Sequence, residues 1–502
     1  VQKRYVELAE PSLADQRTDL QRVQDAVDDL ELHPDLYALR RLPRVLREAD
    51  FKVTAVVVDE ALVDVEAGDT TDRRFGIAVD LGTTTVVATL LDLSTGTPMA
   101  VDSMLNKQQP FGADVITRIS ATMMDPGALG RLSALARETI VELLEQVCRE
   151  AGIATEEVLE LALAGNATMT ALLLGIDPEP LGVAPFIQTA ADWPTLRAAD
   201  LGLPLHPGAR VLVFPSLGAY VGGDIVAGML AAGMDRDKRT RLFIDVGTNC
   251  EIVASDGERI VATAAPAGPA FEGGAIRRGM RAADGAIEVV RLAAEPAEGE
   301  PPVTLGVIGE TTPRGLCGSG LVDAVAELAR VGLLDASGRF VPDEDAAERF
   351  PALADRLTRV GQERVFVLHR HTPDEPVEES IYLSQRDVRE LQFAKAAIST
   401  GWTLLLEELG VQAGDVQQVL LAGSFGSYLS PASAVRIGLV PKLPVLRIVS
   451  AGNVAGEGAK MALLSARERA GAQALLSEVT YVELSDRSDF NDRFVEQLAF
   501  PS

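Results

Sequence analysis

The first 72 residues alternate between helical and strand patterns of apolar residues. Four apolar residues recur at helical spacing: Leu20, Val23, Val27 and Leu30. Ser12 followed by Asp15 is a variant N-cap pair that predicts where this helix begins. Residues 53–58 and 61–65 are apolar and rich in valine, so they predict two strands. The pattern therefore predicts a linker helix and a small α/β domain over residues 1–72.

Two later segments repeat one plan of an apolar strand, a turn and a second strand. Residues 75–96 form the first copy and residues 242–257 the second. Their cores align as VDLGTT (79–84) and IDVGTN (244–249), each with an aspartate near the strand end and a glycine in the turn. Two such hairpins about 165 residues apart predict duplicated halves, each with its own sheet, over residues 75–240 and 241–502.

Two stretches of the second half are polar. Residues 290–310 are rich in alanine, glutamate and proline, which predicts a surface loop. Residues 343–378 are charged and predict a second peripheral segment. Both are therefore expected to lie outside the core.

The charge of the chain narrows the classes of partner. Acidic residues outnumber basic ones, 73 to 46, which gives a net charge of −27. Such a chain repels a phosphate backbone, and no basic stripe with interleaved aromatic residues occurs, so nucleic acid is not an expected partner. An anionic membrane surface is disfavoured for the same reason, and no apolar run reaches a membrane-spanning length. No signal peptide is recognisable, and the cytoplasm is the expected location.

The cysteines and histidines show no metal-binding pattern. Cys148, Cys250 and Cys317 lie far apart in the sequence and form no CxxC pair. Neither a zinc site nor an iron–sulfur cluster is therefore expected from them, and buried reduced thiols are predicted instead. His369 and His371 would share one face of a strand, but no third ligand is near in the sequence, which favours a surface position.

The first hairpin carries groups suited to a phosphate. Gly82 lets the main chain approach a ligand closely, and Thr83, Thr84 and Thr85 add hydroxyl donors. Asp80, beside the turn, is placed to hold Mg²⁺ through water. A single copy is equally well explained as an ordinary tight hairpin.

The second hairpin strengthens the phosphate interpretation, because two facing hairpins can hold a triphosphate from both sides. Gly247, Thr248 and Asn249 match the phosphate-binding turn of the first copy. Asp245 would lie beside the γ-phosphate, where a carboxylate orients water or Mg²⁺. ATP with Mg²⁺ is therefore the expected ligand.

A glycine-rich turn follows a third apolar strand within residues 419–431. Glycine at such a turn lets the main chain approach a purine or a ribose. We expect adenosine contacts from Gly423, Ser424, Phe425 and Gly426. On the predicted helix that begins in the segment 384–398, the side chains of Gln392, Lys395 and Ser399 share one face. That face is either a contact for ribose or adenine, or a solvated surface.

The order of phosphate hairpin, helix, phosphate hairpin and adenosine turn resembles the superfamily of actin, sugar kinases and heat-shock ATPases. The resemblance implies an α/β, actin-like ATPase fold with two ribonuclease-H-like halves, preceded by a small α/β middle domain. Residues 219–233 are similar to the first connecting helix of that superfamily, in which Asp224 takes the acidic position that faces the attacking water. Residues 452–464 are similar to the second connecting helix, whose small residues permit close helix crossing.

Within that superfamily the chain resembles the ATP-dependent reductive activators of corrinoid proteins. Six segments spread over nearly the whole chain carry this resemblance: 5–23, 106–119, 164–179, 265–276, 315–325 and 384–398. The family uses ATP to return the cobalt of a corrinoid methyl carrier from Co(II) to Co(I). The same activity is therefore expected of this chain.

The resemblance also implies partners and a second cofactor. The implied partner is the corrinoid protein of a methyltransferase system, and the implied electron donor is an N-terminal ferredoxin-like domain that carries a 2Fe–2S cluster. This sequence starts at Val1 and has no cysteine set for that cluster, so the cluster is expected only in a domain missing from it. The subunit count stays open, with a homodimer among the options.

Two other functions are compatible with the same fold. A small-molecule kinase of the sugar and acetate kinase superfamily would use Asp245 as a base near the γ-phosphate, but no sugar-binding run is recognisable between the hairpins. An actin-like scaffold would polymerise through exposed apolar loops, which the net charge of −27 disfavours.

Four further residues have both a functional and a structural interpretation. Asp114 could approach the nucleotide cleft or cap the following helix, and Asn166 could reach the cleft or form a turn. Cys317 could be a redox residue, although a small buried side chain is favoured. Glu272 lies among glycines and could contact Mg²⁺ or a partner.

Overall fold

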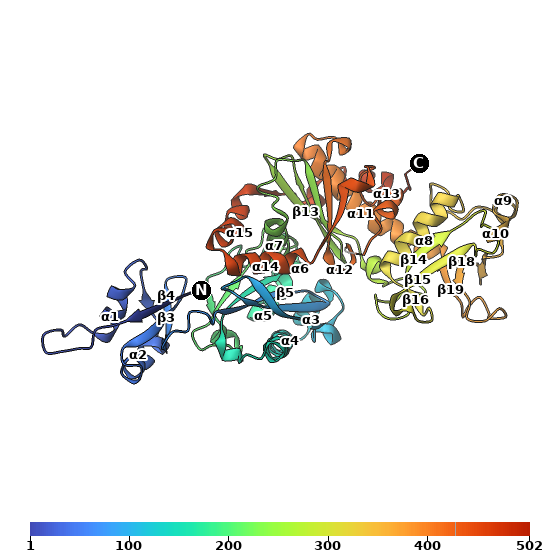
Figure 1. Cartoon of the computed structure of the whole chain (residues 1–502). Coiled ribbons are helices and arrows are strands. Elements are labelled where there is room, and N and C mark those ends of the chain that lie inside the picture. Colours follow the sequence, from blue (N-terminus) through green and yellow to red (C-terminus); the bar gives the residue numbers. More distant parts are fainter. Residues whose placement is uncertain (427, 502) are drawn as a thin grey trace. The chain divides into compact units, whose positions relative to one another are not determined.

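The computed structural model of the chain describes residues 1–426 and 428–501 (Figure 1). The chain folds as two compact units. The first unit consists of Val1–Ala231 and Ala455–Ser477, and the second of Ala232–Val454 and Glu478–Ser502. Within the described residues, none of the helices combines the length and the apolar character needed to cross a membrane.

The N-terminal segment (residues 1–72) folds as a small α/β layer within the first unit. Its elements are β1 (Gln2–Glu7), α1 (Asp19–Ala26), β2 (His33–Pro34), α2 (Leu36–Glu48), β3 (Lys52–Val58) and β4 (Ala61–Ala67). The strands form one sheet in the order β1-β3-β4-β2. The two predicted strands are confirmed as β3 and β4, which pair as an antiparallel hairpin.

The predicted start of the first helix is wrong. Ser12 accepts a hydrogen bond from the backbone N–H of Asp15 at 3.1 Å, but the two residues close a turn with no helix after it. Helix α1 begins at Asp19 instead, where the Thr18 hydroxyl accepts the N–H of Gln21 at 3.1 Å. Both sites offer a short hydroxyl acceptor, and apolar packing decides which one caps a helix.

The rest of the first unit is a six-stranded sheet with helices around it. Its strands are β5 (Phe75–Leu81), β6 (Thr85–Asp92), β7 (Thr97–Leu105), β8 (Val158–Gly165), β9 (Leu196–Arg197) and β10 (Arg210–Val213). Its helices are α3 (Val115–Met124), α4 (Ala128–Ala151), α5 (Ala167–Leu174), α6 (Glu179–Gly182), α7 (Gly223–Ala232), α14 (Val454–Leu464) and α15 (Ala466–Glu478). A Cβ on Gly458 of α14 would lie 2.1 Å from the carbonyl oxygen of Ala227 in α7, so the two helices cross with their backbones in contact.

The second unit contains one six-stranded sheet and two three-stranded sheets. Its strands are β11 (Arg241–Asp245), β12 (Asn249–Ser255), β13 (Ile260–Pro266), β14 (Ala286–Leu292), β15 (Val303–Val307), β16 (Gly315–Leu316), β17 (Leu357–Val360), β18 (Glu363–His369), β19 (Ile381–Ser384), β20 (Gln418–Ala422), β21 (Ile448–Gly452) and β22 (Val479–Tyr481). Its helices are α8 (Gly318–Val331), α9 (Asp343–Arg349), α10 (Pro351–Ala354), α11 (Gln385–Leu409), α12 (Gly423–Gly426), α13 (Pro431–Ile437) and α16 (Phe490–Glu496).

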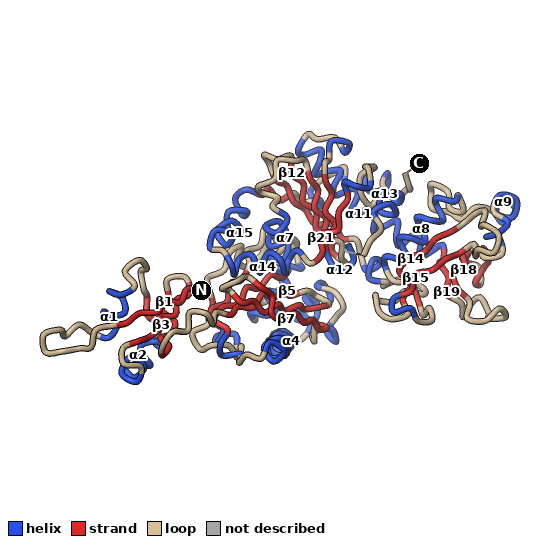
Figure 2. Tube along the Cα trace, in the orientation of Figure 1, coloured by secondary structure: helices blue, strands red, loops and turns tan. Residues whose placement is uncertain are grey.

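Five strands of each six-stranded sheet follow the same order; Figure 2 draws the strands in red. The order β7-β6-β5-β8-β10 in the first unit corresponds to β13-β12-β11-β20-β21 in the second. In each sheet the first three strands along the chain are antiparallel, and the next strand joins them in parallel. The duplicated, actin-like α/β plan predicted from the two hairpins is therefore confirmed.

Two stretches predicted to be peripheral are structured. Residues 290–310 include the end of β14 and all of β15, which pair with each other. Residues 343–378 include α9, α10, β17 and β18, and Leu353 and Phe366 from this range are fully buried. The surface-loop prediction is wrong because short strands with few apolar residues look like polar loops until their partner strands are known.

The N-terminal segment is joined to the six-stranded sheet of the first unit by a buried ionic cluster. Asp64, on β4, is 1% exposed, accepts from Nε2 of His206 at 3.0 Å and is paired with Arg41. The N–H of Gly208 donates to Nδ1 of His206 at 3.0 Å, which places the imidazole proton on Nε2. His206 therefore donates to Asp64, and one carboxylate links the two parts of the unit.

We expect Asp64→Ala to lower the free energy of unfolding by roughly 2–4 kcal/mol. Arg41 is partly exposed and recovers water, but His206 loses its acceptor inside the protein. Chemical denaturation followed by circular dichroism measures the change. The matched control is Asp29→Ala, which removes an exposed pair with Arg4 and should cost less than about 1 kcal/mol. Equal losses in the two variants would contradict the role given to Asp64.

Candidate nucleotide site

The first predicted phosphate hairpin lies in the first unit, between β5 and β6. A Cβ on Gly82 would lie 2.3 Å from the carbonyl oxygen of Thr85, so the turn itself excludes any other residue there. Thr83 and Thr84 form the tip and are partly buried, whereas Thr85 is exposed. Asp80 is partly buried at the end of β5. The predicted glycine therefore does lie in the turn. The close approach that it permits is between its own backbone and the carbonyl oxygen of Thr85 in the same hairpin.

The segment after β7 holds this hairpin from behind. The Asn106 amide donates to the carbonyl oxygen of Gly82 at 3.0 Å, and its backbone N–H donates to that of Thr84 at 2.9 Å. The guanidinium of Arg118 donates to the carbonyl oxygen of Thr83 at 2.7 Å. Three successive carbonyls of the hairpin are thus turned toward residues 106–118.

These contacts fix the direction of the hairpin's N–H groups. In a trans peptide the C=O and the N–H point in opposite directions. The N–H groups of Thr83 and Thr84 therefore point away from Asn106 and Arg118, and no hydrogen bond among the described residues uses either of them. Two adjacent N–H groups that point outward suit an anion.

Two further residues support the tip of the hairpin. The Asn166 amide donates to the hydroxyl of Thr83 at 3.0 Å, and its carbonyl oxygen caps α5 by accepting the N–H of Met169 at 2.9 Å. Both interpretations of Asn166 therefore hold in part, because it forms a cap and also touches the predicted site. A Cβ on Gly222 would lie 2.5 Å from the Cα of Asn166, which brings the start of α7 close to the hairpin.

Asp224, in the first turn of α7, is the acidic residue predicted to face the attacking water. Its carboxylate accepts the N–H of Ile225 at 2.9 Å. Burial raises the pKa of Asp224 to about 6. A carboxyl with a pKa raised toward neutrality suits a proton acceptor, because its protonation state can change near the working pH.

The second hairpin lies in the second unit and has supports of its own. The Thr248 hydroxyl donates to the Glu272 carboxylate, and the N–H of Gly268 donates to the carbonyl oxygen of Thr248 at 3.0 Å. The Cys250 thiol donates to the carbonyl oxygen of Gly247 at 3.2 Å. Glu272 thus belongs to the surroundings of the second hairpin, and its predicted contact with Mg²⁺ or a partner stays a prediction.

The glycine-rich turn packs against Asp245 of the same unit. Gly423 has a φ of +85°, and a Cβ there would lie 2.4 Å from Oδ1 of Asp245. Phe425 is buried and stacks on Phe271, with ring centroids 5.0 Å apart. The side chain of Ser424 lies outside the part of the chain that the structure describes. The predicted γ-phosphate residue and the predicted adenosine turn are therefore direct neighbours.

Gln392 and Lys395 are buried under the C-terminal segment of the chain. The Gln392 amide donates to the carbonyl oxygen of Leu498 at 2.8 Å, and the Lys395 ammonium donates to that of Ala499 at 2.5 Å. Burial lowers the pKa of Lys395 to about 8. The solvated-surface alternative is wrong, since both side chains are 1% exposed. Their predicted contact with adenosine stays a prediction.

The remaining candidate residues have structural positions. Asp114 caps α3 by accepting the N–H of Thr117 at 2.8 Å. Cys148, Cys250 and Cys317 are buried free thiols, as predicted. Burial raises the pKa of Cys148 to about 11 and that of Cys250 well above its ordinary value. Among the described residues, no cluster of three His, Cys, Asp or Glu side chains is arranged to hold a metal ion directly.

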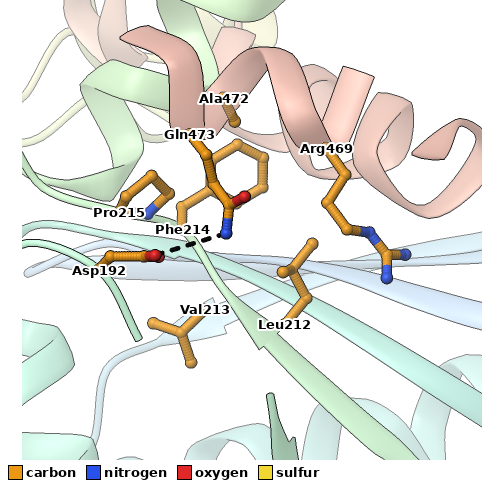
Figure 3. A pocket seen from close by; sticks show the side chains of 8 residues that line it. All are labelled: Asp192, Leu212, Val213, Phe214, Pro215, Arg469, Ala472 and Gln473. Atoms are coloured by element: carbon orange, nitrogen blue, oxygen red, sulfur yellow. Dashed lines mark hydrogen bonds between the residues drawn. The ribbon is translucent and has the colours of Figure 1, made fainter. Parts of the chain in front are cut away.

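A small cavity between β10 and α15 lies apart from these residues (Figure 3). Its volume is about 10 Å³, roughly the room of one water molecule. Arg469 lies on its rim and pairs with the buried Glu160 at 2.7 Å, and Gln473 donates to Asp192 at 3.5 Å. The cavity is too small for a nucleotide.

Sequence reasoning missed Asn106 and Arg118 as supports of the first hairpin. Both lie in the segment 106–119 that carries the family resemblance, and both are fully buried polar residues. Polar residues inside an otherwise apolar pattern were the available signal, but their partners are distant in the sequence.

Three family profiles match consecutive parts of the chain. The RACo linker region matches residues 1–72, the RACo middle region matches 75–237, and the C-terminal domain of RACo, described as the ASKHA domain, matches 239–502.

Proteins similar to this chain come from bacteria and archaea. The corrinoid activation enzyme RamQ of Eubacterium limosum is 36% identical over 469 residues, which cover 93% of this chain and 77% of RamQ. The Co(II) methylated amine-specific corrinoid protein reductase of Methanosarcina barkeri is 24% identical over 455 residues, 85% of this chain and 77% of the reductase.

A solved structure covers the whole chain. The reductive activator for corrinoid, iron–sulfur protein has a TM-score of 0.86 and 34% sequence identity, and the match covers 100% of this chain and 79% of the activator.

We expect Gly423→Ala to weaken ATP binding by about tenfold or more, because a Cβ there would lie 2.4 Å from Oδ1 of Asp245 and 2.9 Å from the carbonyl oxygen of Val246 and would push the predicted adenosine turn out of place. Isothermal titration calorimetry measures the affinity. Gly410→Ala is the matched control, since Gly410 has a similar φ of +71° but nothing within 4 Å of a Cβ. Loss of affinity in both variants to the same extent would assign the effect to backbone strain instead.

Proposed function

Because the chain belongs to the RACo family, we propose that it is an ATP-dependent reductive activator that returns a corrinoid methyl-carrier protein from Co(II) to Co(I). The observation that carries the proposal is the 36% identity to a corrinoid activation enzyme over 93% of the chain. The two hairpins on matching sheets supply the ATPase half of that activity. The relatives favour this function over a small-molecule kinase.

The chain's own residues fit ATP with Mg²⁺. In this proposal the outward N–H groups of Thr83 and Thr84, together with Gly82 and Thr85, bind phosphate from the first unit. Gly247, Thr248 and Asn249 do so from the second. Asp80 and Asp245 hold Mg²⁺ through water, which neutralises charge on the phosphates when bound. The turn Gly423–Gly426 contacts adenosine, with Gln392 and Lys395 as further candidates.

Catalysis of ATP hydrolysis is assigned to three carboxylates: Asp80, Asp224 and Asp245. Asp224 orients the attacking water and draws its proton, which its pKa of about 6 allows at neutral pH. Asp245, held against Gly423, keeps its carboxylate in one position relative to the second hairpin. The water adds to the γ-phosphorus, the bond to the bridging oxygen breaks, and the products are ADP and inorganic phosphate.

Reduction of Co(II) to Co(I) consumes one electron, and in the part of the chain that the structure describes no three His, Cys, Asp or Glu side chains are grouped to hold a metal ion. In this proposal the electron comes from a ferredoxin-like domain with a 2Fe–2S cluster, and this chain contributes ATP hydrolysis and docking of the corrinoid protein. Residues 1–72 are the linker helix and the small α/β domain, residues 75–240 the first ATPase half and residues 241–502 the second. Binding of ATP biases the chain toward a state with a different affinity for its partner.

Asp245→Asn should lower the rate of ATP hydrolysis about 100-fold or more, whereas the ATP affinity should change less than about threefold. The amide keeps the shape of the carboxylate but loses the charge near the reacting phosphate. Steady-state ADP release and equilibrium titration separate the two quantities. Unchanged turnover in this variant would remove Asp245 from the catalytic set.

The function is tested by titrating the chain with a Co(II) corrinoid protein in the presence and absence of a non-hydrolysable ATP analogue. We expect the analogue to change the corrinoid-protein affinity by a coupling free energy of about 1–3 kcal/mol, or roughly 5–150-fold. The corrinoid protein should change the affinity for the analogue by the same factor. No binding in either state, across corrinoid proteins of the source organism, would reject the proposal.

A further inference from the structure

We propose that Arg118 is a positioning residue of the phosphate site, which sets the orientation of the first hairpin and supplies positive charge behind it. The inference rests on the proposed function, because it names a residue of the same ATP site. Arg118 lies on α3, outside the predicted set of binding residues, and its side chain is fully buried. It therefore acts on a phosphate only through the hairpin that it holds.

The groups that accept hydrogen bonds from Arg118 in the described structure are all neutral. Its guanidinium donates to the carbonyl oxygens of Thr83 at 2.7 Å and Gly112 at 3.0 Å, and to the side-chain carbonyl of Gln108 at 2.8 Å. It also lies 3.1 Å from the sulfur of Met169. Among the described residues, no carboxylate forms an ion pair with it, although Asp114 is near enough to raise its pKa slightly.

Arg118 is nevertheless a cation at neutral pH. Burial lowers its pKa to about 10, which is still well above 7. A buried charge without an opposite charge is unfavourable unless something compensates it. The missing negative charge is the one that a bound phosphate would bring to the outer side of the same hairpin.

The geometry links Arg118 to that outer side through one peptide group. The carbonyl oxygen of Thr83 accepts from Arg118, and the N–H of Thr84 belongs to the same peptide and points the opposite way. A hydrogen bond to the carbonyl polarises the peptide, which strengthens its N–H as a donor. Arg118 thus contributes both orientation and charge to phosphate binding.

A purely structural role makes a different prediction. If Arg118 only packed α3 against residues 108–112, its loss would destabilise the fold without regard to the number of phosphates on a ligand. If it serves the phosphate site, its loss should penalise ATP strongly, ADP less, and adenosine hardly at all. The dependence on phosphate number is therefore the decisive quantity.

The experiment compares the affinities of ATP, ADP and adenosine for the wild-type chain, Arg118→Met and Arg22→Met. Methionine fills a similar volume without charge. Arg22 is the matched control: it is 3% exposed and donates to the carbonyl oxygens of Ala9 and Asp15, but it lies in the N-terminal segment and pairs with the Asp15 carboxylate. Calorimetric titration with Mg²⁺ present gives all nine affinities.

We expect Arg118→Met to lower the ratio of ATP affinity to adenosine affinity by about tenfold or more, with adenosine affinity within about twofold of wild type. Arg22→Met should leave the ratio unchanged. An unchanged ratio in Arg118→Met would overturn the inference and leave Arg118 a packing residue. If wild type itself binds ATP no more tightly than adenosine, the proposed ATP site fails, whatever Arg118 does.

A second measurement covers the case in which Arg118→Met does not fold. In wild-type chain labelled with ¹⁵N-arginine, the Nε–H signal of Arg118 is assigned by its loss in Arg118→Lys, which keeps the charge. ATP should shift this signal and adenosine should leave it in place, because only ATP places negative charge beyond the Thr83–Thr84 peptide. No shift on saturation with ATP would overturn the inference.

Discussion

The candidate site depends on one constraint, which is that the backbone carbonyls of the first hairpin point toward the segment 106–118. Asn106 and Arg118 donate hydrogen bonds to the carbonyl oxygens of Gly82, Thr83 and Thr84. Because each peptide group is planar and trans, the N–H groups of Thr83 and Thr84 then point outward. The outward direction of these donors, on which the proposed phosphate site depends, therefore comes from the segment behind the turn as much as from its own glycine and threonines.

The second hairpin is also held by hydrogen bonds to its backbone carbonyls, but from other residues. Gly268 donates to the carbonyl oxygen of Thr248, and the thiol of Cys250 donates to that of Gly247, so here too the hairpin is held by its carbonyls. No buried arginine takes part in the described contacts of this hairpin. The two halves share a fold, but a buried arginine contacts the hairpin carbonyls in the described part of the first unit alone.

Close packing also joins the proposed catalytic carboxylate Asp245 and the proposed adenosine turn within the second unit. Gly423 begins the adenosine turn, and its missing side chain leaves room for Asp245 at the end of the neighbouring strand β11. A change in the turn therefore reaches the carboxylate directly. In the first unit, the Asp64 cluster similarly joins the N-terminal segment to the six-stranded sheet.

The sequence by itself determined the elements that local patterns encode. Such patterns are the alternation of apolar and polar residues, the placement of glycines and the spacing of cysteines, all of which depend on neighbours along the chain. They predicted the strands and turns of both hairpins, the paired strands β3 and β4, the buried thiols and the duplicated plan. Only the tertiary structure decided which distant residues meet. Three such contacts join Arg118 to Thr83, Thr248 to Glu272, and Lys395 to Ala499, and the partners are 24 to 104 positions apart in the sequence. Likewise, β14 and β15 are strands because they pair with each other. Hydrogen bonds between such residues leave no periodic trace in a sequence, because their free energy depends on geometry that the whole fold creates.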